Sequence, residues 1–204
     1  NGRLLTKHLG GYLPFVVDLS KHLRYGADNE VTVALDNRDN EITGPKPMAT
    51  LDFNMYGGLY RDATLLIKEP LHITDEIMAG KKAGGGVFVT YPHVSRERAE
   101  ILIKTDVSQQ SGHRLTHTLW NGKERVAEGS SSDGRDVTLT VSNPRLWSPR
   151  TPNLYRLVTR LEADGKVTDE RVTRIGIRRI GFAGHRLLIN GEPEFLRGVY
   201  RHQG

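Results

Sequence analysis

Apolar and polar residues alternate with a period of two along much of the chain. Residues 31–35 (VTVAL) and 136–142 (DVTLTVS) show this alternation plainly. A third segment sets apolar residues on one face against charged residues on the other: Ala99, Ile101, Ile103 and Val107 against Glu100, Lys104 and Asp106. Because side chains along a strand point alternately to the two faces of a sheet, these segments predict half-buried antiparallel strands. Long amphipathic helical windows are absent, so the predicted fold class is all-β.

Three dipeptides at the ends of predicted strands have the composition of tight hairpin turns. They are Asn121-Gly122, Asp164-Gly165 and Asn190-Gly191. A type I′ turn requires positive φ at both central residues, which Asn, Asp and Gly tolerate best. The sequence therefore predicts a hairpin with each of these dipeptides at its tip. Residues 195–200 (FLRGVY), after the last hairpin, have the pattern of a further, buried strand.

A domain boundary is predicted near Glu69-Pro70, where the spacing of the strands changes. Before it, strands alternate with long irregular loops such as residues 36–60. After it, over residues 71–179, strands recur at the short spacing of a β-sandwich. This second region has about the length and strand number of an immunoglobulin-like domain. The first region reads as the C-terminal part of a larger β-domain.

Composition and charge restrict the class of protein. Hydrophobic residues make up 37% of the 204 residues and charged residues 26%, as in globular domains. The net charge is +5, but basic and acidic residues are interleaved rather than sorted into a stripe, which argues against a nucleic-acid partner. No apolar run approaches the roughly 18 residues that span a bilayer, so no membrane partner is predicted. The chain has no cysteine, which excludes disulfides and thiolate metal sites.

Two segments have a superficial likeness to ligand sites. His113 and His117 lie four residues apart, a spacing that on a helix would place both on one face. The flanking residues predict a strand and no third ligand is near, so they are predicted to be surface histidines rather than a zinc site. The glycine-rich segment 79–86 (AGKKAGGG) lacks the final Gly-Lys-Ser/Thr of a phosphate-binding loop and precedes a strand. It is predicted to be a flexible connection.

Aromatic and acidic residues offer the remaining candidates. Trp120 and Trp147 could each stack on a sugar ring, but a single tryptophan in a β-sandwich more often belongs to the core, and core positions are predicted for both. The pair Asp169-Glu170 follows a predicted hairpin and is predicted to be solvated. The residues alone thus indicate two β-modules without a visible catalytic set.

Five segments, in order along the chain, resemble the accessory region of glycoside hydrolase family 2, the group of β-galactosidases, β-glucuronidases and β-mannosidases. They are residues 8–20 (HLGGYLPFVVDLS), 56–65 (YGGLYRDATL), 143–157 (NPRLWSPRTPNLYRL), 175–180 (IGIRRI) and 187–203 (LLINGEPEFLRGVYRHQ). The resemblance implies three parts: residues 1–69 from a sugar-binding jelly-roll, residues 70–180 as an immunoglobulin-like β-sandwich, and residues 181–204 as a linker with the first strand of an incomplete (β/α)₈ catalytic barrel.

The resemblance implies a fragment of a retaining glycosidase. Such enzymes use two carboxylic groups about 5–5.5 Å apart, and in this family both are glutamates on later barrel strands, beyond residue 204. No catalytic residue is therefore assigned within the chain, which is expected to be inactive alone. The parent is expected to hydrolyse β-galactosides. The alternatives are a β-glucuronidase or β-mannosidase parent, or a stand-alone carbohydrate-binding or interaction module.

Two residues are implied to bind substrate in the complete enzyme. His202 matches the histidine of the family's Gly-Val-Asn-Arg-His motif, with Tyr200 standing where asparagine is usual. Asp52 lies five residues before Gly57, near an acid that in the galactosidase branch reaches the O6 region of the sugar. Its alternative is a loop carboxylate that accepts hydrogen bonds from backbone amides. Arg61 and Asp62 are expected to form a structural pair.

The resemblance also gives expectations about partners and cofactors. A carbohydrate substrate is expected through the full-length enzyme, and a homo-oligomer is left open. No cofactor is expected in this chain, and a bound sodium or magnesium ion is left open for the full-length enzyme. The cellular compartment is not determined by the sequence, although a periplasmic or extracellular setting fits polysaccharide degradation.

Overall fold

The computed structural model of the chain describes residues 1–38, 40, 42, 57–109 and 111–199. The chain divides into two compact units, one formed by Asn1–Leu66 with the residues from Gly198 on, and the other by Ile67–Arg197. The domain limits expected at residues 69 and 180 stay predictions.

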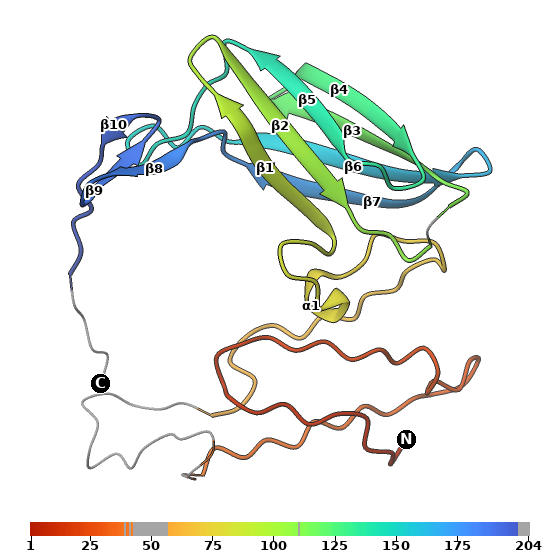
Figure 1. Cartoon of the computed structure of the whole chain (residues 1–204). Coiled ribbons are helices and arrows are strands. Elements are labelled where there is room, and N and C mark those ends of the chain that lie inside the picture. Colours follow the sequence, from red (N-terminus) through yellow and green to blue (C-terminus); the bar gives the residue numbers. More distant parts are fainter. Residues whose placement is uncertain (39, 41, 43–56, 110, 200–204) are drawn as a thin grey trace. The chain divides into compact units, whose positions relative to one another are not determined.

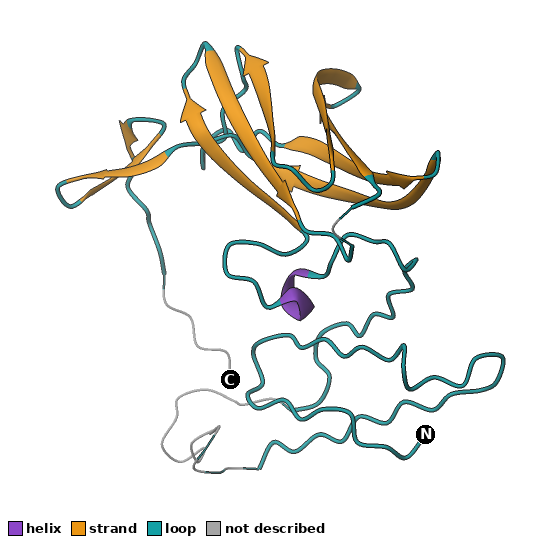
Figure 2. Ribbon diagram, turned by 45° about the vertical axis from the view of Figure 1, so that its right-hand side comes forward, coloured by secondary structure: helices purple, strands orange, loops and turns teal. Residues whose placement is uncertain are grey.

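The larger unit, Ile67–Arg197, contains every strand and the single helix of the described residues (Figures 1 and 2). In chain order these elements are α1 (Glu76–Ala79), β1 (Val87–Val94), β2 (Arg98–Thr105), β3 (Arg114–Asn121), β4 (Glu124–Ser132), β5 (Val137–Ser142), β6 (Tyr155–Ala163), β7 (Lys166–Ile175), β8 (Ile180–Ala183), β9 (Arg186–Ile189) and β10 (Glu192–Pro193). None of the helical residues described forms a segment with the length and apolar character that crossing a bilayer demands.

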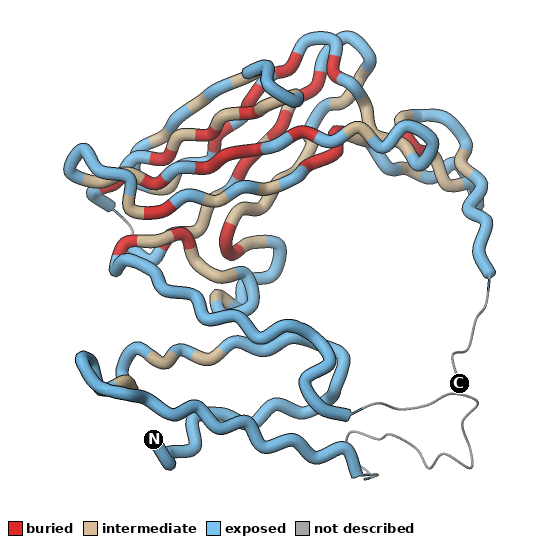
Figure 3. Tube along the Cα trace, turned by 180° about the vertical axis from the view of Figure 1, so that it is seen from behind, coloured by how far each residue is buried: buried red, intermediate tan, exposed pale blue. Residues whose placement is uncertain are grey.

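Three antiparallel sheets make up this unit. Two larger sheets have the strand orders β1-β2-β5 and β4-β3-β6-β7, and the small third sheet has the order β10-β9-β8. One core cluster joins both larger sheets: Ala99, Ile101 and Ile103 of β2 and Leu139 and Val141 of β5 pack with Leu119, Leu157 and Ile175 of the four-stranded sheet. The larger sheets therefore form a β-sandwich whose buried residues lie between them (Figure 3). The all-β prediction is confirmed.

Strand register in the sandwich follows the hydrophobic alternation. The β5 segment alternates strictly between buried and exposed residues, with Val137, Leu139 and Val141 inward. Ala99, Ile101 and Ile103 of β2 are each at most 1% exposed, as predicted. Because a slip of one residue would turn this whole set toward solvent, burial fixes the pairing of β2 with β5.

The structure contains tight turns at or next to each of the three dipeptides predicted to form hairpins. Asp164 and Gly165 have φ values of 50° and 73°, and Asn190 and Gly191 have 55° and 86°, so both predicted turns are confirmed. The prediction for Asn121-Gly122 is displaced by one residue, because Asn121 still pairs with Glu124 at the end of β3. The loop is therefore Gly122-Lys123, with glycine at the first central position, as type II′ turns require.

The smaller unit has no strand among its described residues, so the strand predicted at residues 31–35 is wrong. Val31, Val33 and Leu35 are 65%, 46% and 53% exposed. Alternation records only that a segment is amphipathic; a strand forms when a neighbouring strand accepts its hydrogen bonds and a facing layer covers its apolar side. The assignment of residues 1–69 to a jelly-roll stays a prediction.

The end of the described chain also differs from its sequence pattern. Glu194 is the last residue to continue the ladder, donating its amide to the carbonyl of Leu187 at 2.9 Å. The segment 195–199 that follows is not a strand, and Phe195 and Val199 are 80% and 95% exposed. The buried strand predicted from residue 195 is therefore wrong over the described residues, since no neighbouring strand pairs with it there. Its place in a barrel stays a prediction.

Candidate functional site

The two substrate-binding residues predicted from the sequence, Asp52 and His202, lie outside the described residues, as does Tyr200. Their roles stay predictions. Arg61 and Asp62 are described, and within the described part of the chain no ion pair joins them. The guanidinium of Arg61 lies instead 5.8 Å from the centre of the Tyr60 ring.

His113 and His117 are both buried, so the prediction of surface histidines is wrong. Their relative exposures are 5% and 1%. His117 points into the sandwich from β3, and its Nδ1 lies 3.0 Å from the hydroxyl oxygen of Thr159 on β6. Burial lowers the pKa of His117 from 6.5 to about 4, so its imidazole is neutral near pH 7. Among the residues the structure describes, no group of three His, Asp or Glu side chains could hold a metal ion.

The buried His117 should make stability depend on pH. Its pKa is about 4 in the folded chain, against the ordinary histidine value of 6.5 that applies when the chain is unfolded. The unfolded chain therefore binds the proton more tightly, and stability is lost as pH falls from 6.5 toward 4. We expect a loss of up to about 3 kcal/mol over this window, measured by urea unfolding at each pH. His117→Leu should flatten this part of the profile, while His93→Gln, at an exposed position, should leave it intact. An unchanged slope in His117→Leu would refute the assignment.

Asp169 is the one buried carboxylate among the described residues, so the prediction that it is solvated is wrong. Its Oδ1 accepts a hydrogen bond from the ammonium of Lys68 at 2.6 Å and another from the amide of Glu170 at 2.9 Å. Its Oδ2 accepts one from the amide of Ile73 at 3.0 Å. This carboxylate therefore fastens the segment that enters the sandwich to β7.

Trp120 and Trp147 are half-buried and lie outside the fully buried core, so the core prediction is wrong for both. An arginine covers each ring: Arg156 lies 5.5 Å from the centre of Trp120, and Arg178 lies 5.1 Å from that of Trp147. A Cβ at Gly176 would come within 2.9 Å of the Trp147 ring, so this glycine allows the indole to lie against the backbone.

The glycine-rich segment 79–86 begins with the last residue of α1. Asp75 caps this single turn by accepting hydrogen bonds from the amides of Ile77 and Met78, and Gly80 ends it in the left-handed conformation. Glu76 on the same turn binds Arg171 of β7 through both carboxylate oxygens, at 2.7 Å each. The turn is thus fixed to the sandwich at its start. Flexibility of the rest stays a prediction.

Asn190 links the C-terminal hairpin sheet, β8-β9-β10, to the segment that carries Trp147. The Asn190 side chain donates to the carbonyl of Trp147 at 2.9 Å and accepts from the amide of Arg179 at 3.0 Å. Its own amide donates to the carbonyl of Arg179 at 2.8 Å. The sequence signalled Asn190 only as a turn residue; its role in holding the hairpin depends on a residue 43 positions away.

Replacing Asn190 should loosen the hairpin without unfolding the sandwich. Asn190→Ala removes both side-chain hydrogen bonds and places alanine at a φ of 55°. We expect a local cost of about 1–3 kcal/mol, seen as faster hydrogen exchange of the β8 and β9 amides with β2 and β3 unchanged. Asn121→Ala is the matched control, because Asn121 also ends a strand beside a glycine but has no positive φ. Equal exchange in both variants would contradict the assigned role.

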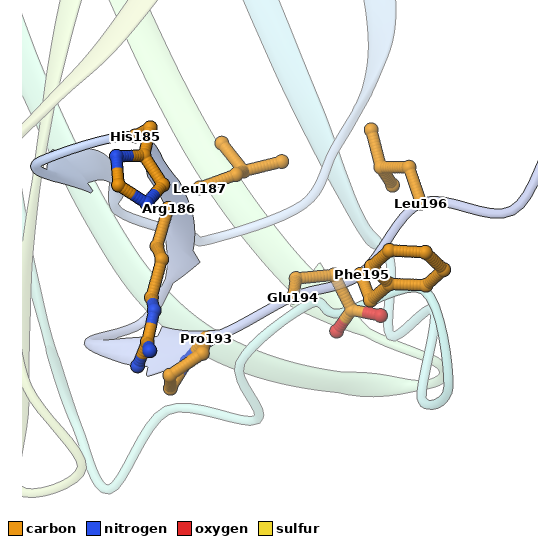
Figure 4. Close-up of a pocket in the computed structure, with 7 residues that line it drawn as sticks. All are labelled: His185, Arg186, Leu187, Pro193, Glu194, Phe195 and Leu196. Carbon is orange, nitrogen blue, oxygen red and sulfur yellow. The ribbon is translucent and has the colours of Figure 1, made fainter.

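A shallow cavity of about 450 Å³ lies against this hairpin. Its walls come from the β8–β9 turn and β9 on one side and from the segment after β9 on the other (Figure 4). The lining residues are His185, Arg186, Leu187, Pro193, Glu194, Phe195 and Leu196. Exposed apolar side chains dominate it, with Phe195 80% and Leu196 68% exposed. This chemistry suits contact with another protein surface better than proton transfer.

Comparison with known proteins identifies the family. The family model described as "Glycosyl hydrolases family 2" matches residues 86–178, which span the sandwich from the residue before β1 to the segment after β7. A β-galactosidase of Thermoanaerobacter pseudethanolicus is 30% identical to this chain, and the match covers 100% of this chain and 27% of the β-galactosidase. The chain belongs to glycosyl hydrolase family 2.

Further members of family 2 resemble the chain in sequence and fold. A putative β-glucuronidase of Formosa agariphila is 28% identical over the whole chain. Among solved structures, a family 2 member from Bacteroides cellulosilyticus has a TM-score of 0.51 and 29% identity, and covers 61% of this chain and 18% of its own. A β-glucuronidase from Ruminococcus gnavus, in complex with N1-substituted uronic isofagomine, has a TM-score of 0.52 and 25% identity, with 63% and 20% coverage.

This chain spans only about a quarter of the curated family 2 relatives. It corresponds to 27% of the β-galactosidase and 24% of the putative β-glucuronidase. The described residues include a sandwich whose entry segment is hydrogen-bonded to Asp169 of β7, and a hairpin that is hydrogen-bonded to the loop before β6 through Asn190.

Proposed function

We propose that the chain is the non-catalytic connecting region of a retaining glycoside hydrolase that acts on β-galactosides. The observation that carries this proposal is the similarity of the whole chain to a β-galactosidase of which it spans 27%. In this proposal the sandwich connects a sugar-binding unit to a catalytic unit and fixes their relative position. The apolar cavity at the C-terminal hairpin is where the catalytic unit packs.

The carboxylates of the described residues support a structural role. A general acid in a glycosidase needs a raised pKa and access to the glycosidic oxygen. Asp169 is buried, and its carboxylate oxygens already accept hydrogen bonds from Lys68 and two backbone amides, so it has no access to a glycosidic oxygen. Glu76 and Glu170 are committed to Arg171 and Arg160. We therefore assign the catalytic glutamates to the part of the parent outside this chain.

The proposal retains two residues of this chain as substrate contacts in the parent. His202 donates a hydrogen bond to a sugar hydroxyl, and Asp52 accepts hydrogen bonds from hydroxyls near O6, where the resemblance implies a sodium ion. The parent as a whole is proposed to bind a sodium or magnesium ion. A carboxylate with several acceptor sites suits such a polyol.

A β-glucuronidase parent is the second candidate, and two of the similar proteins support it. The Formosa protein and the Ruminococcus structure are both described as β-glucuronidases. The test is to compare kcat/KM of the full-length parent on nitrophenyl β-galactoside, β-glucuronide and β-mannoside. The proposal expects the galactoside to be hydrolysed with the highest kcat/KM. A higher value for the glucuronide would replace it with the second candidate, and no turnover of any of the three would favour a carbohydrate-binding or interaction module.

A further inference from the structure

The outer face of the four-stranded sheet places one aromatic and three basic residues in a single register row. Arg125 pairs with Trp120, Trp120 with Arg156, and Arg156 with Arg174, from β4 through β3 and β6 to β7. The neighbours Leu119, Leu157 and Ile175 are buried in the core. Because side chains alternate between faces along a strand, the row points away from the core.

Two of these arginines face each other across β6 and β7 without a counter-charge. Within the described part of the chain, the Arg174 side chain has no hydrogen bond or ion pair, and the Arg156 guanidinium has neither but lies 5.5 Å from the centre of the Trp120 ring. Arg125 differs, because it pairs with Glu128 at 3.1 Å. We name Trp120, Arg156 and Arg174 the arginine row.

The same two strands show what a balanced pair looks like. Farther along β6 and β7, Arg160 lies opposite Glu170, and its Nε donates to the carboxylate at 2.6 Å. Like charges directly opposite on neighbouring strands are destabilising, whereas opposite charges are stabilising. The Arg156–Arg174 pair therefore costs stability in the free chain, and an anion bound between the two guanidiniums would remove that cost.

The side chains around the two arginines indicate which chemical class of anion would bind there. An arginine stacked on an aromatic ring is held in place, and its planar guanidinium binds a carboxylate or sulfate through two parallel hydrogen bonds. The next register row adds the half-exposed Val172 and the Thr118 hydroxyl, which donates to Glu128 at 3.1 Å and can still accept a hydrogen bond. Guanidinium donors, a hydroxyl acceptor and apolar surface together suit a sugar ring that carries a negative group.

We propose that the arginine row is a binding site for an acidic oligosaccharide. In this site the guanidiniums of Arg156 and Arg174 bind the carboxylate or sulfate of one sugar unit. The proposal does not depend on which glycoside the parent cleaves. Nucleic acid fits less well, since Glu128 in the next register row and Glu170 two rows away lie on the same face and interrupt any continuous basic stripe.

The test is calorimetric titration of the 204-residue chain with trigalacturonate, a sulfated galactose trisaccharide and neutral galactotriose. We expect the uronate or the sulfated sugar to bind and the neutral sugar to bind at least about tenfold more weakly; the preference between the first two identifies the anion. Arg156→Gln and Arg174→Gln should each weaken binding about tenfold. Arg160→Gln is the matched control on the same face and should change the Kd less than about twofold, because Arg160 is already paired. Circular dichroism spectra should be equal for all variants.

Four results would overturn the proposal. These are equal binding of neutral galactotriose, an unchanged Kd in both Arg156→Gln and Arg174→Gln, an equal loss in Arg160→Gln, and binding of inorganic sulfate or a poly-glutamate peptide as tight as that of the acidic sugars. Tight binding of the peptide would identify the row as a protein-docking surface instead. None of these results bears on hydrolysis by the parent.

Discussion

Replacing Asp169 by alanine is expected to lower the free energy of unfolding of the chain by about 3–5 kcal/mol. The side chain of Asp169 is only 7% exposed, and it accepts hydrogen bonds from Lys68 and from the amides of Ile73 and Glu170. Its removal leaves the Ile73 amide buried without this acceptor and the Lys68 ammonium, itself 27% exposed, without its counter-charge. Urea unfolding of the purified chain measures the loss.

A double-mutant cycle separates the ion pair from simple packing. Lys68→Met leaves the Asp169 carboxylate buried without its ammonium and should also be costly. Lys68→Met combined with Asp169→Leu removes both charges, so it should cost less than the sum of the single changes. Strict additivity of the two changes would show that Lys68 and Asp169 do not interact in solution.

Replacing His202 by alanine is expected to depress the activity of the proposed full-length parent. The function proposed above has this histidine donate a hydrogen bond to the bound sugar. The loss of one preorganised donor costs on the order of 2–4 kcal/mol in the transition state, which is roughly 30- to 1000-fold in kcat/KM. The melting temperature should stay nearly unchanged, since the side chain is assigned to substrate rather than packing.

The control for His202→Ala is His93→Ala, at an exposed position on β1 that has no assigned contact with substrate. It should leave both kcat/KM and the melting temperature at wild-type values. If His202→Ala retains wild-type kinetics, or if it unfolds the parent, the family role does not apply to this residue. Tyr200, which replaces the usual asparagine, is then the first position to examine.

The sandwich strands could be predicted because burial and local sequence agree there. β5 alternates strictly, and its apolar residues lie beside those of β2 on the core-facing side of one sheet. The turns at Asp164 and Asn190 could be predicted for a local reason as well, since positive φ restricts the residue types. Asn121-Gly122 shows the limit: the dipeptide marks a turn, but the pairing of Asn121 with Glu124 decides which residues form the loop.

Long-range partners could not be predicted from local patterns. Asp169 looks like any acidic residue after a hairpin, and its partner Lys68 lies 101 positions earlier in the sequence. His113, just before β3, and His117 on β3 lie at positions that face the core. The His117 imidazole fits there because burial lowers its pKa and keeps it neutral. The alternation of β3 therefore predicts burial at these two positions, whereas the polar character of histidine predicts exposure.

The candidate substrate residues illustrate a different limit. Asp52 and His202 came from a resemblance to family motifs, not from spacing or periodicity, and they lie outside the described residues. Residues 31–35 and 195–199 carry strand-like patterns, yet neither segment is a strand. A β pattern gives the side chains that a strand would bury, while its partner strand and covering layer must come from elsewhere in the protein.

The measurement that tests the central claim most directly is steady-state hydrolysis by the purified 204-residue chain beside the full-length parent. Nitrophenyl β-galactoside, β-glucuronide and β-mannoside serve as substrates, and circular dichroism confirms that the sandwich is folded. The account predicts turnover by the parent and none by the chain, because both catalytic glutamates are assigned outside it. Saturable turnover by the pure chain would contradict the account, since a working pair of carboxylic groups would then lie within these 204 residues.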